Sequence, residues 1–234
     1  MNDIGASLAL AVGLITGGDP ELWRTVALSL EVSLAAATLA CVAGLPLGAL
    51  VAVGRFPGRH SVIVALNALL ALPSVVVGLV AYLMLSRAGP LGSLGILFTP
   101  TAIVIAQAIL VLPIVAALAR QFVEDAWHEY EEQLRSLNVS RARAVPTLLL
   151  DLRFALFTVV LAGFGRAASE VGAVMIVGGN IDGVTRVMTT AIALETSKGD
   201  LPLALALGIV LLTLVLAINA IAYVMREWSA RRHG

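Results

Sequence analysis

Apolar residues in this chain occur in long blocks rather than at the spacing of an amphipathic surface helix. A nearly charge-free apolar block of about 18 residues or more is typical of a transmembrane helix, because unpaired backbone amides are too costly in hydrocarbon. We predict five spans, at about 25–53, 61–85, 100–120, 148–178 and 201–225. The pattern therefore predicts an all-α, polytopic transmembrane helical bundle.

A further apolar stretch at residues 4–16 is only 13 residues long, which is short for a crossing. We interpret it as a short interfacial or partner-binding helix, with a sixth short span as the alternative. No repeat, low-complexity tract or second domain is evident, so residues 1–234 are predicted to form a single transmembrane domain. Because no half of the chain is duplicated, a symmetric pathway needs two copies, which favours a homodimer.

The composition agrees with a membrane location and argues against catalysis. Hydrophobic residues make up 59% of the chain and charged residues 13%, about half the share that is usual in soluble domains. The single cysteine, Cys41, lies in an apolar block, which excludes a disulfide framework within the chain and a cysteine-based metal motif. The three histidines are scattered, and no phosphate-binding GxxxxGK[ST] loop precedes the one lysine, Lys198. We therefore expect no cofactor in this chain and no hydrolysis of ATP by it.

The basic residues divide unevenly between the two sets of connections. Ten of the fifteen fall on one side of the predicted spans, four fall on the other, and Arg166 lies within a span. Lys and Arg are enriched in cytoplasmic connections. We therefore predict an extracytoplasmic N-terminus and a cytoplasmic C-terminus.

The largest predicted cytoplasmic segment, at about 121–147, carries the highest concentration of charge. Its acidic first half and basic second half suit a helix, because acids favour the N-terminal end and bases the C-terminal end. Leu134 and Leu137 lie three residues apart on one face, and Asn138 tolerates the left-handed backbone that ends a helix. The segment predicts a short helix–turn–helix lying across the membrane face; a solvated loop is the alternative.

This segment resembles the EAA loop of ABC importer permeases, which docks a short coupling helix into a groove of the ATPase subunit. The pattern of that family, Glu-Ala-Ala, three residues, then Gly, falls on Glu132-Gln133-Leu134 and Asn138. Both alanines and the glycine are replaced, and the later Leu-Pro is absent, with Pro146 standing just before a leucine run. The resemblance implies that the coupling residues are Glu131, Glu132, Gln133, Leu134, Leu137 and Asn138.

Longer strings resemble a narrower group, the tungstate-type permeases, which are close to the molybdate and sulfate permeases. They lie at 72–79, 86–92, 98–101, 165–175, 178–181 and 185–196. The resemblance implies a homodimeric pore in a bacterial or archaeal cytoplasmic membrane, in contact with membrane lipid. It also implies two cytoplasmic ATPase subunits that hold ATP and Mg, and an extracytoplasmic substrate-binding protein. Nucleic acid is not an expected partner.

The expected function is import of tungstate or molybdate, and three alternatives stay open. The first is a permease for sulfate or phosphate. The second is an ion-coupled secondary transporter, against which the missing internal repeat counts. The third is a structural membrane subunit, for which transport would show no ATP dependence.

Polar residues inside the predicted spans are candidates for the translocation path. Arg166 and Glu170 are four residues apart, which would place both on one face of the span at 148–178. Charges at membrane depth are costly, so the two either neutralise each other in packing or place Arg166 beside an anion path. Pro73, which would kink its helix, and Gln107, a potential interhelical hydrogen-bond donor, are the other candidates.

Overall fold

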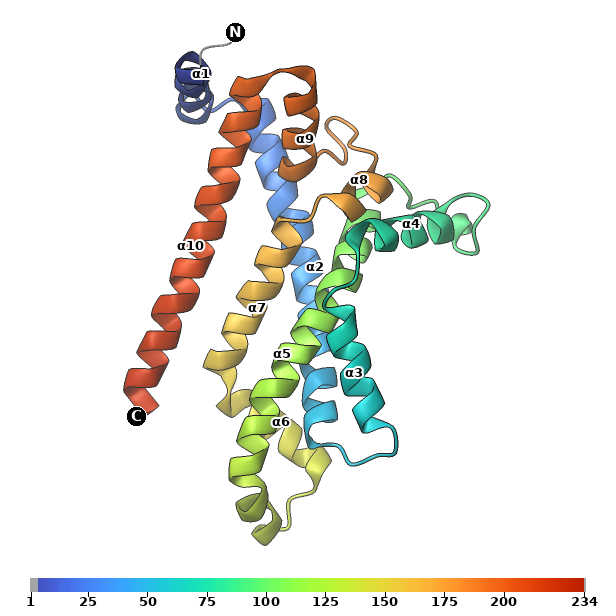
Figure 1. The fold of residues 1–234 in the computed structure, drawn as a ribbon, viewed down its shortest axis with the longest axis vertical. Helices are drawn as coiled ribbons and strands as arrows, with labels where there is room; N and C mark the ends of the chain where they lie inside the picture. Colours follow the sequence, from blue (N-terminus) through green and yellow to red (C-terminus); the bar gives the residue numbers. More distant parts are fainter. Residues whose placement is uncertain (1–3, 234) are drawn as a thin grey trace. The chain divides into compact units, whose positions relative to one another are not determined.

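The structure, a computed structural model, describes the backbone of residues 4–233 and the side chains of residues 4–225. Within these residues every regular element is helical and none is a strand, which confirms the all-α prediction. The elements are α1 Ile4–Thr16, α2 Pro20–Val53, α3 Arg59–Leu69, α4 Ser74–Leu85, the short 3₁₀ helix η1 Gly92–Leu94, α5 Pro100–Ser136, α6 Arg141–Asp151, α7 Arg153–Ala168, α8 Gly172–Gly178, α9 Met188–Lys198 and α10 Leu201–His233 (Figure 1). The side chains of Arg226, Arg231 and Arg232, which contribute to the predicted orientation, lie outside the described residues.

Three of the described helices, α2, α5 and α10, are each long and apolar enough to cross a membrane. Two sharply bent pairs, α3 with α4 and α6 with α7, reach that length and composition only when each pair is taken together. The described part of the chain thus offers three spans, or up to five if each bent pair counts as one. This agrees with a multi-pass membrane protein.

The stretch predicted as one span at 61–85 is divided between α3 and α4 by a break at residues 70–73. The break falls at Leu72-Pro73, where the proline ring disfavours helical backbone in the residue before it and the proline nitrogen has no hydrogen to donate. Pro73 precedes α4 with an extended backbone, and its carbonyl accepts hydrogen bonds from the amides of Val76 and Val77. Pro73 therefore starts a new helix rather than kinking an existing one.

The stretch predicted as one span at 148–178 is divided among α6, α7 and α8, with a bend of 78° between α6 and α7. Helix α7 ends at Ala168, so Glu170 lies in the short connection before α8 while Arg166 lies in the last turn of α7. The prediction that these two residues share one face of one helix is therefore wrong. The Oε1 atom of Glu170 accepts a hydrogen bond from the amide of Ala173, which helps the new helix to start.

Helix also extends beyond the predicted spans. Helix α5 continues from its apolar half through to Ser136, well into the segment predicted at 121–147. Between the predicted spans at 148–178 and 201–225 lies α9.

The chain divides into two compact units. The first is built from the segment ending at Ala35 together with Pro73–Gln107 and Ala167–Ile218, and the second from Ala36–Leu72, Ala108–Arg166 and the segment beginning at Asn219. In the first unit, α8 lies directly on α4: a Cβ placed on Gly78 would come within 2.7 Å of the Cα of Ala173. Glycine is needed there because the two backbones touch.

A cluster of buried apolar residues joins four helices of the first unit, α1, α2, α9 and α10. It comprises Ala11, Leu22, Val26, Met188, Ala191, Ala206 and Leu207. Ser29 of α2 adds a polar contact, because its hydroxyl accepts a hydrogen bond from the amide of Met188 at 2.7 Å.

The second unit is organised around a close approach of α2 and α5. A Cβ placed on Gly48 would collide with the carbonyl oxygen of Ala116, and one placed on Gly44 would crowd Val115. Small residues at such spacing allow helix backbones to pack closely in membranes. The packing continues beyond this crossing into the part of α5 that lies past Arg120.

Candidate functional site: the turn between α5 and α6

The end of α5 and the start of α6 are joined by a tight turn, residues 137–140, centred on Asn138. Asn138 has a φ of 58°, the left-handed conformation that the sequence predicted. Its amide donates to the carbonyl of Arg135 at 3.0 Å, and the amide of Val139 donates to the carbonyl of Leu134 at 2.9 Å. This pair of bonds is the Schellman arrangement that closes a helix C-terminus. The predicted helices and turn are present, but the first helix is the end of the long α5 rather than a short separate helix.

A buried core lies beneath the turn and fixes its position on the second unit. Trp127 and Val123 of α5 pack with Val145 and Leu148 of α6 and with the last turns of α2. Trp127 is only 5% exposed. The extension of α5 is therefore an integral part of this unit rather than a solvated loop.

Two carboxylates on α5 also hold the extension in place. The Oε1 atom of Glu131 lies 3.2 Å from Arg55, 3.1 Å from Arg141 and 3.9 Å from Arg135. These arginines come from the α2–α3 connection, from the first residue of α6 and from α5 itself. Arg141 also lies over the ring of Trp127, with 5.7 Å between its Cζ atom and the ring centroid. We call Glu131 with these three arginines the Glu131 cluster.

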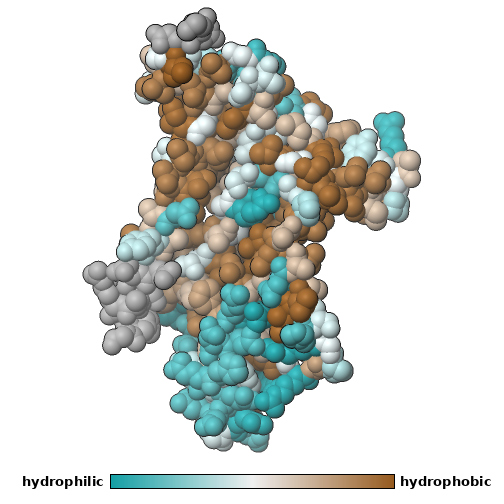
Figure 2. All heavy atoms as spheres, in the orientation of Figure 1, coloured by the Kyte–Doolittle hydropathy of each residue, from teal (hydrophilic) through white to brown (hydrophobic). Residues whose placement is uncertain are grey.

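The second carboxylate, Glu124, is paired with Arg59 at 2.6 Å and with Arg120. Arg59 also donates to the carbonyls of Val51 and Ala52, at 2.8 and 3.0 Å. Carbonyls in the last turn of a helix have no partner within the helix, so Arg59 caps α2 while holding α5. Figure 2 shows the hydrophilic residues that gather around this end of α5 and α6.

The residues predicted to dock onto a partner do not all point the same way. Leu137 is 73% exposed, which is unusual for a leucine in a charged segment. Together with Gln133 and Leu134 it lines a groove of about 290 Å³, whose other walls are Tyr130, Thr147, Leu148 and Asp151.

The two glutamates among the residues predicted to contact the ATPase differ in exposure. Glu131 turns toward the chain's own arginines, whereas its neighbour Glu132 is exposed. The negative charges of Glu129 and Asp151 raise the pKa of Tyr130, which further favours its neutral phenol. The groove beside Leu137 therefore combines apolar side chains with a neutral phenol and the carboxyl group of Asp151.

Two candidates for the translocation path, Gln107 and Glu170, meet at the carbonyl of Ala167, which also accepts from the backbone amide of Glu170 at 3.1 Å. Gln107 is buried, and its side-chain amide donates to the carbonyl of Ala167 at 2.9 Å. Glu170 is also buried, and its backbone carbonyl accepts from the hydroxyl of Thr189 at 2.7 Å. Arg166 is half-buried, and Pro73 is exposed. Gln107 and Glu170 thus hold helix ends within the first unit.

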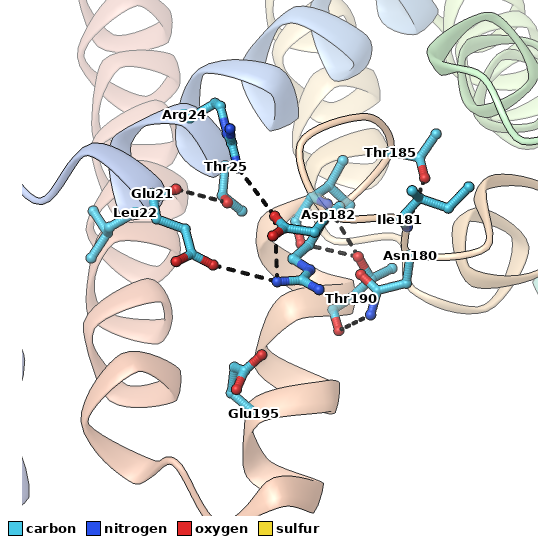
Figure 3. A network of polar contacts seen from close by, with 12 residues as sticks. Glu21, Leu22, Arg24, Thr25, Asn180, Ile181, Asp182, Thr185, Thr190 and Glu195 are labelled. Atoms are coloured by element: carbon cyan, nitrogen blue, oxygen red, sulfur yellow. Dashed lines mark hydrogen bonds and ion pairs between the residues drawn. The ribbon is translucent and has the colours of Figure 1, made fainter.

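Sequence reasoning missed a polar network at the α8–α9 connection of the first unit (Figure 3). The hydroxyl of Thr185 donates to the carbonyl of Gly178 at 2.6 Å and accepts from the amide of Ile181 at 2.9 Å. Asp182 pairs with Arg24 at 3.1 Å and with Arg186 at 3.5 Å. The available signal was the run Asn180-Ile181-Asp182-Gly183, a composition typical of a tight turn.

Metal binding has no support among the described residues, because no three His, Cys, Asp or Glu side chains gather closely enough to hold an ion. The polar groups are instead engaged in ion pairs and helix caps.

Comparison with known proteins identifies the class of this helical assembly. Residues 44–233 match the family described as the binding-protein-dependent transport system inner membrane component. The chain belongs to this family. The match includes both the α5–α6 turn and the α8–α9 connection, so the inner membrane component accounts for most of the described fold.

Three related permease proteins are similar to this chain over two thirds or more of its length. The tungstate uptake system permease protein TupB of Peptoclostridium acidaminophilum is 41% identical over 97% of this chain and all of its own length. The molybdenum transport system permease protein ModB of Escherichia coli K12 is 30% identical over 91% of this chain and 95% of its own. The sulfate transport system permease protein CysT of Salmonella typhimurium is 30% identical over 68% of this chain and 60% of its own.

Proposed function

We propose that this chain is the permease subunit of an ATP-driven importer of tungstate. The observation that carries the proposal is the identity of 41% across nearly the whole chain with a tungstate uptake permease, compared with 30% for the molybdenum and sulfate permeases. Two copies form the path, an extracytoplasmic binding protein delivers the anion, and two cytoplasmic ATPase subunits drive the cycle. Molybdate is the alternative cargo.

The α5–α6 turn is the proposed contact with the ATPase. The uneven division of basic residues supports a cytoplasmic location for this turn. Leu137 then presents an apolar knob to the ATPase, while the core around Trp127 and the Glu131 cluster keep the turn rigid. A movement of the ATPase subunits is thereby passed to α5 and α6 without being lost in a flexible loop.

Transport by the reconstituted complex tests the cargo. The chain, its ATPase and its binding protein are placed in proteoliposomes, and uptake of tungstate, molybdate and sulfate is measured with and without ATP. We expect ATP-dependent uptake of tungstate that excess molybdate reduces only weakly. Uptake without ATP would contradict the importer, whereas ATP-dependent uptake of another anion would contradict only the cargo.

The Leu137→Asp substitution tests the docking role. The charge would disrupt an apolar contact with the ATPase, so we expect at least a tenfold loss of the ATPase activity that loaded binding protein stimulates. Leu137 is so exposed that the melting temperature of the chain should not change. Ser136→Asp is the matched control, because Ser136 is exposed in the same segment and gains the same charge but does not line the groove. Normal stimulated activity from Leu137→Asp would exclude the docking role.

Arg166 and Glu170 admit two roles, and we favour helix packing over a place on the anion path. Removing one charge at membrane depth leaves the other uncompensated, which costs about 3–5 kcal/mol when the pair is buried. We therefore expect Arg166→Gln and Glu170→Gln to be unstable singly, and the double variant to be folded and partly active. Melting temperature and tungstate uptake are measured together. A stable double variant without uptake would place Arg166 on the path instead.

A further inference from the structure

A second groove of the second unit, distinct from the one beside Leu137, lies where the membrane part of α2 ends. It has a volume of about 520 Å³ and is formed by the last turns of α2, the start of the α2–α3 connection and the start of α6. Leu47, Leu50 and Phe56 line it with side chains that are 40–49% exposed. At one end the guanidinium groups of Arg55 and Arg141 complete the lining. The groove is therefore amphipathic, with apolar walls and a cationic end.

Its position along the chain matches the boundary between hydrocarbon and headgroups. Residues 32–54 carry no charged side chain, and the first charge after them is Arg55. About 20 helical residues span the roughly 30 Å hydrocarbon core of a bilayer. Since the chain belongs to an inner membrane family, this spacing predicts that Leu47 and Leu50 lie at the depth of acyl chains and Arg55 at the depth of lipid phosphates.

The cationic end retains an excess of positive charge. Two arginines of the Glu131 cluster, Arg55 and Arg141, line the groove, and they share the one carboxylate of Glu131. Arg55 reaches Glu131 through one terminal nitrogen only, and its side chain is 66% exposed. Its remaining donors can bind a phosphate oxygen, and guanidinium groups bind phosphate with two parallel hydrogen bonds. Basic pockets at the cytoplasmic ends of membrane helices bind anionic headgroups in this way.

We propose that this groove binds an anionic phospholipid, with its phosphate on Arg55 and Arg141 and an acyl chain along Leu47, Leu50 and Phe56. Free phosphate would leave the apolar walls in water, which favours a lipid as the occupant. The bound lipid fastens the α2–α3 connection to α6 beside the Glu131 cluster. The proposal needs only the membrane location of the chain, and is independent of which anion the importer carries.

Lipid titration followed by native mass spectrometry tests this site on the full purified chain. Dioleoylphosphatidylglycerol and dioleoylphosphatidylcholine are added separately, and their dissociation constants are compared. We expect one tight phosphatidylglycerol site per chain with about a fivefold preference over phosphatidylcholine, the amount that one arginine near a membrane surface provides. Arg55→Gln should abolish this preference. Leu50→Gln should weaken the binding of both lipids.

Arg135→Gln is the matched control. Arg135 is 65% exposed, close to the value for Arg55, and also faces Glu131, but it does not line the groove. Its substitution should leave the preference for phosphatidylglycerol unchanged. An equal loss from both variants would show a general effect of net charge and overturn the proposal, as would unchanged binding to Arg55→Gln. A shift from dimer to monomer caused by Arg55→Gln, with no effect of added lipid, would assign the groove to a second copy of the chain and also overturn it.

Discussion

The α5–α6 turn and the α8–α9 connection are both polar segments beside membrane helices, yet they are held in different ways. The α5–α6 turn depends on ion pairs around Glu131 and Glu124, with a core of apolar residues beneath them. The α8–α9 connection depends on hydroxyl groups, chiefly that of Thr185, which bind backbone groups in a buried setting. Buried hydrogen bonds are little affected by salt, whereas partly exposed ion pairs are screened by it. We therefore expect salt to weaken the α5–α6 turn, and the loss of a hydroxyl group to weaken the α8–α9 connection.

The largest loss of stability should come from Thr185→Val in the α8–α9 connection. Valine keeps the shape but removes both the donor to Gly178 and the acceptor for Ile181, leaving two backbone groups unsatisfied. We expect a loss of about 2–4 kcal/mol in the free energy of unfolding, because each buried unpaired group costs about 1–3 kcal/mol. Thr185→Ser restores the hydroxyl and should lose less than about 1 kcal/mol. Unfolding in mild detergent at low and high salt measures both, and a strong salt dependence would refute the hydroxyl mechanism.

A smaller effect is expected at the α5–α6 turn from Glu131→Gln. The amide keeps a hydrogen-bond acceptor but loses the charge that attracts Arg55, Arg135 and Arg141. We expect a loss of about 1–2 kcal/mol at low salt, since bonds to charged groups contribute about 1.5–3 kcal/mol and exposed pairs less. The difference from the parent should shrink in 1 M salt. Glu132→Gln, at the exposed neighbouring position, is the control, and an equal loss there would remove the special role of Glu131.

The smallest effect should come from the ion pair between Arg24 and Asp182. Both side chains are more than half exposed, at 58% and 56%, so water and salt screen the interaction. We expect Arg24→Gln, which removes this pair and leaves the contact of Asp182 with Arg186, to change the free energy of unfolding by no more than about 0.5 kcal/mol. The same unfolding measurement applies. A loss as large as that of Thr185→Val would show that ion pairs, not hydroxyl groups, hold this connection, and the contrast between the two segments would disappear.

The parts of the fold that depend on one residue and its neighbours were predictable from the sequence. Asn138 is an example, because its tolerance of left-handed backbone is a local property. The apolar blocks likewise predicted an all-helical membrane protein. The break between α7 and α8 was missed, since no proline marks it and its polar residues, Arg166 and Glu170, were interpreted as two charges on one helix rather than as a helix end.

Contacts between distant parts of the chain also could not be predicted from the sequence. Arg55 and Glu131 are separated by 76 positions, and nothing in either segment indicates the other. Glu131 was consequently grouped with residues that face a partner, although its carboxylate faces the chain's own arginines. The assignment of Leu137 as a docking residue stays a prediction. Because Leu137 is exposed, a substitution there tests coupling with little effect on folding.

The contact of Gly48 with Ala116 has a consequence for the biosynthesis of the protein. Helix α2 leaves the ribosome well before α5, and elongation at about 5–20 residues per second separates the two by several seconds. During that interval the glycine face of α2 has no helix to receive it and is in contact with lipid or with the insertion machinery. The order of synthesis therefore makes α2 an early, incomplete intermediate that becomes stable only when α5 arrives.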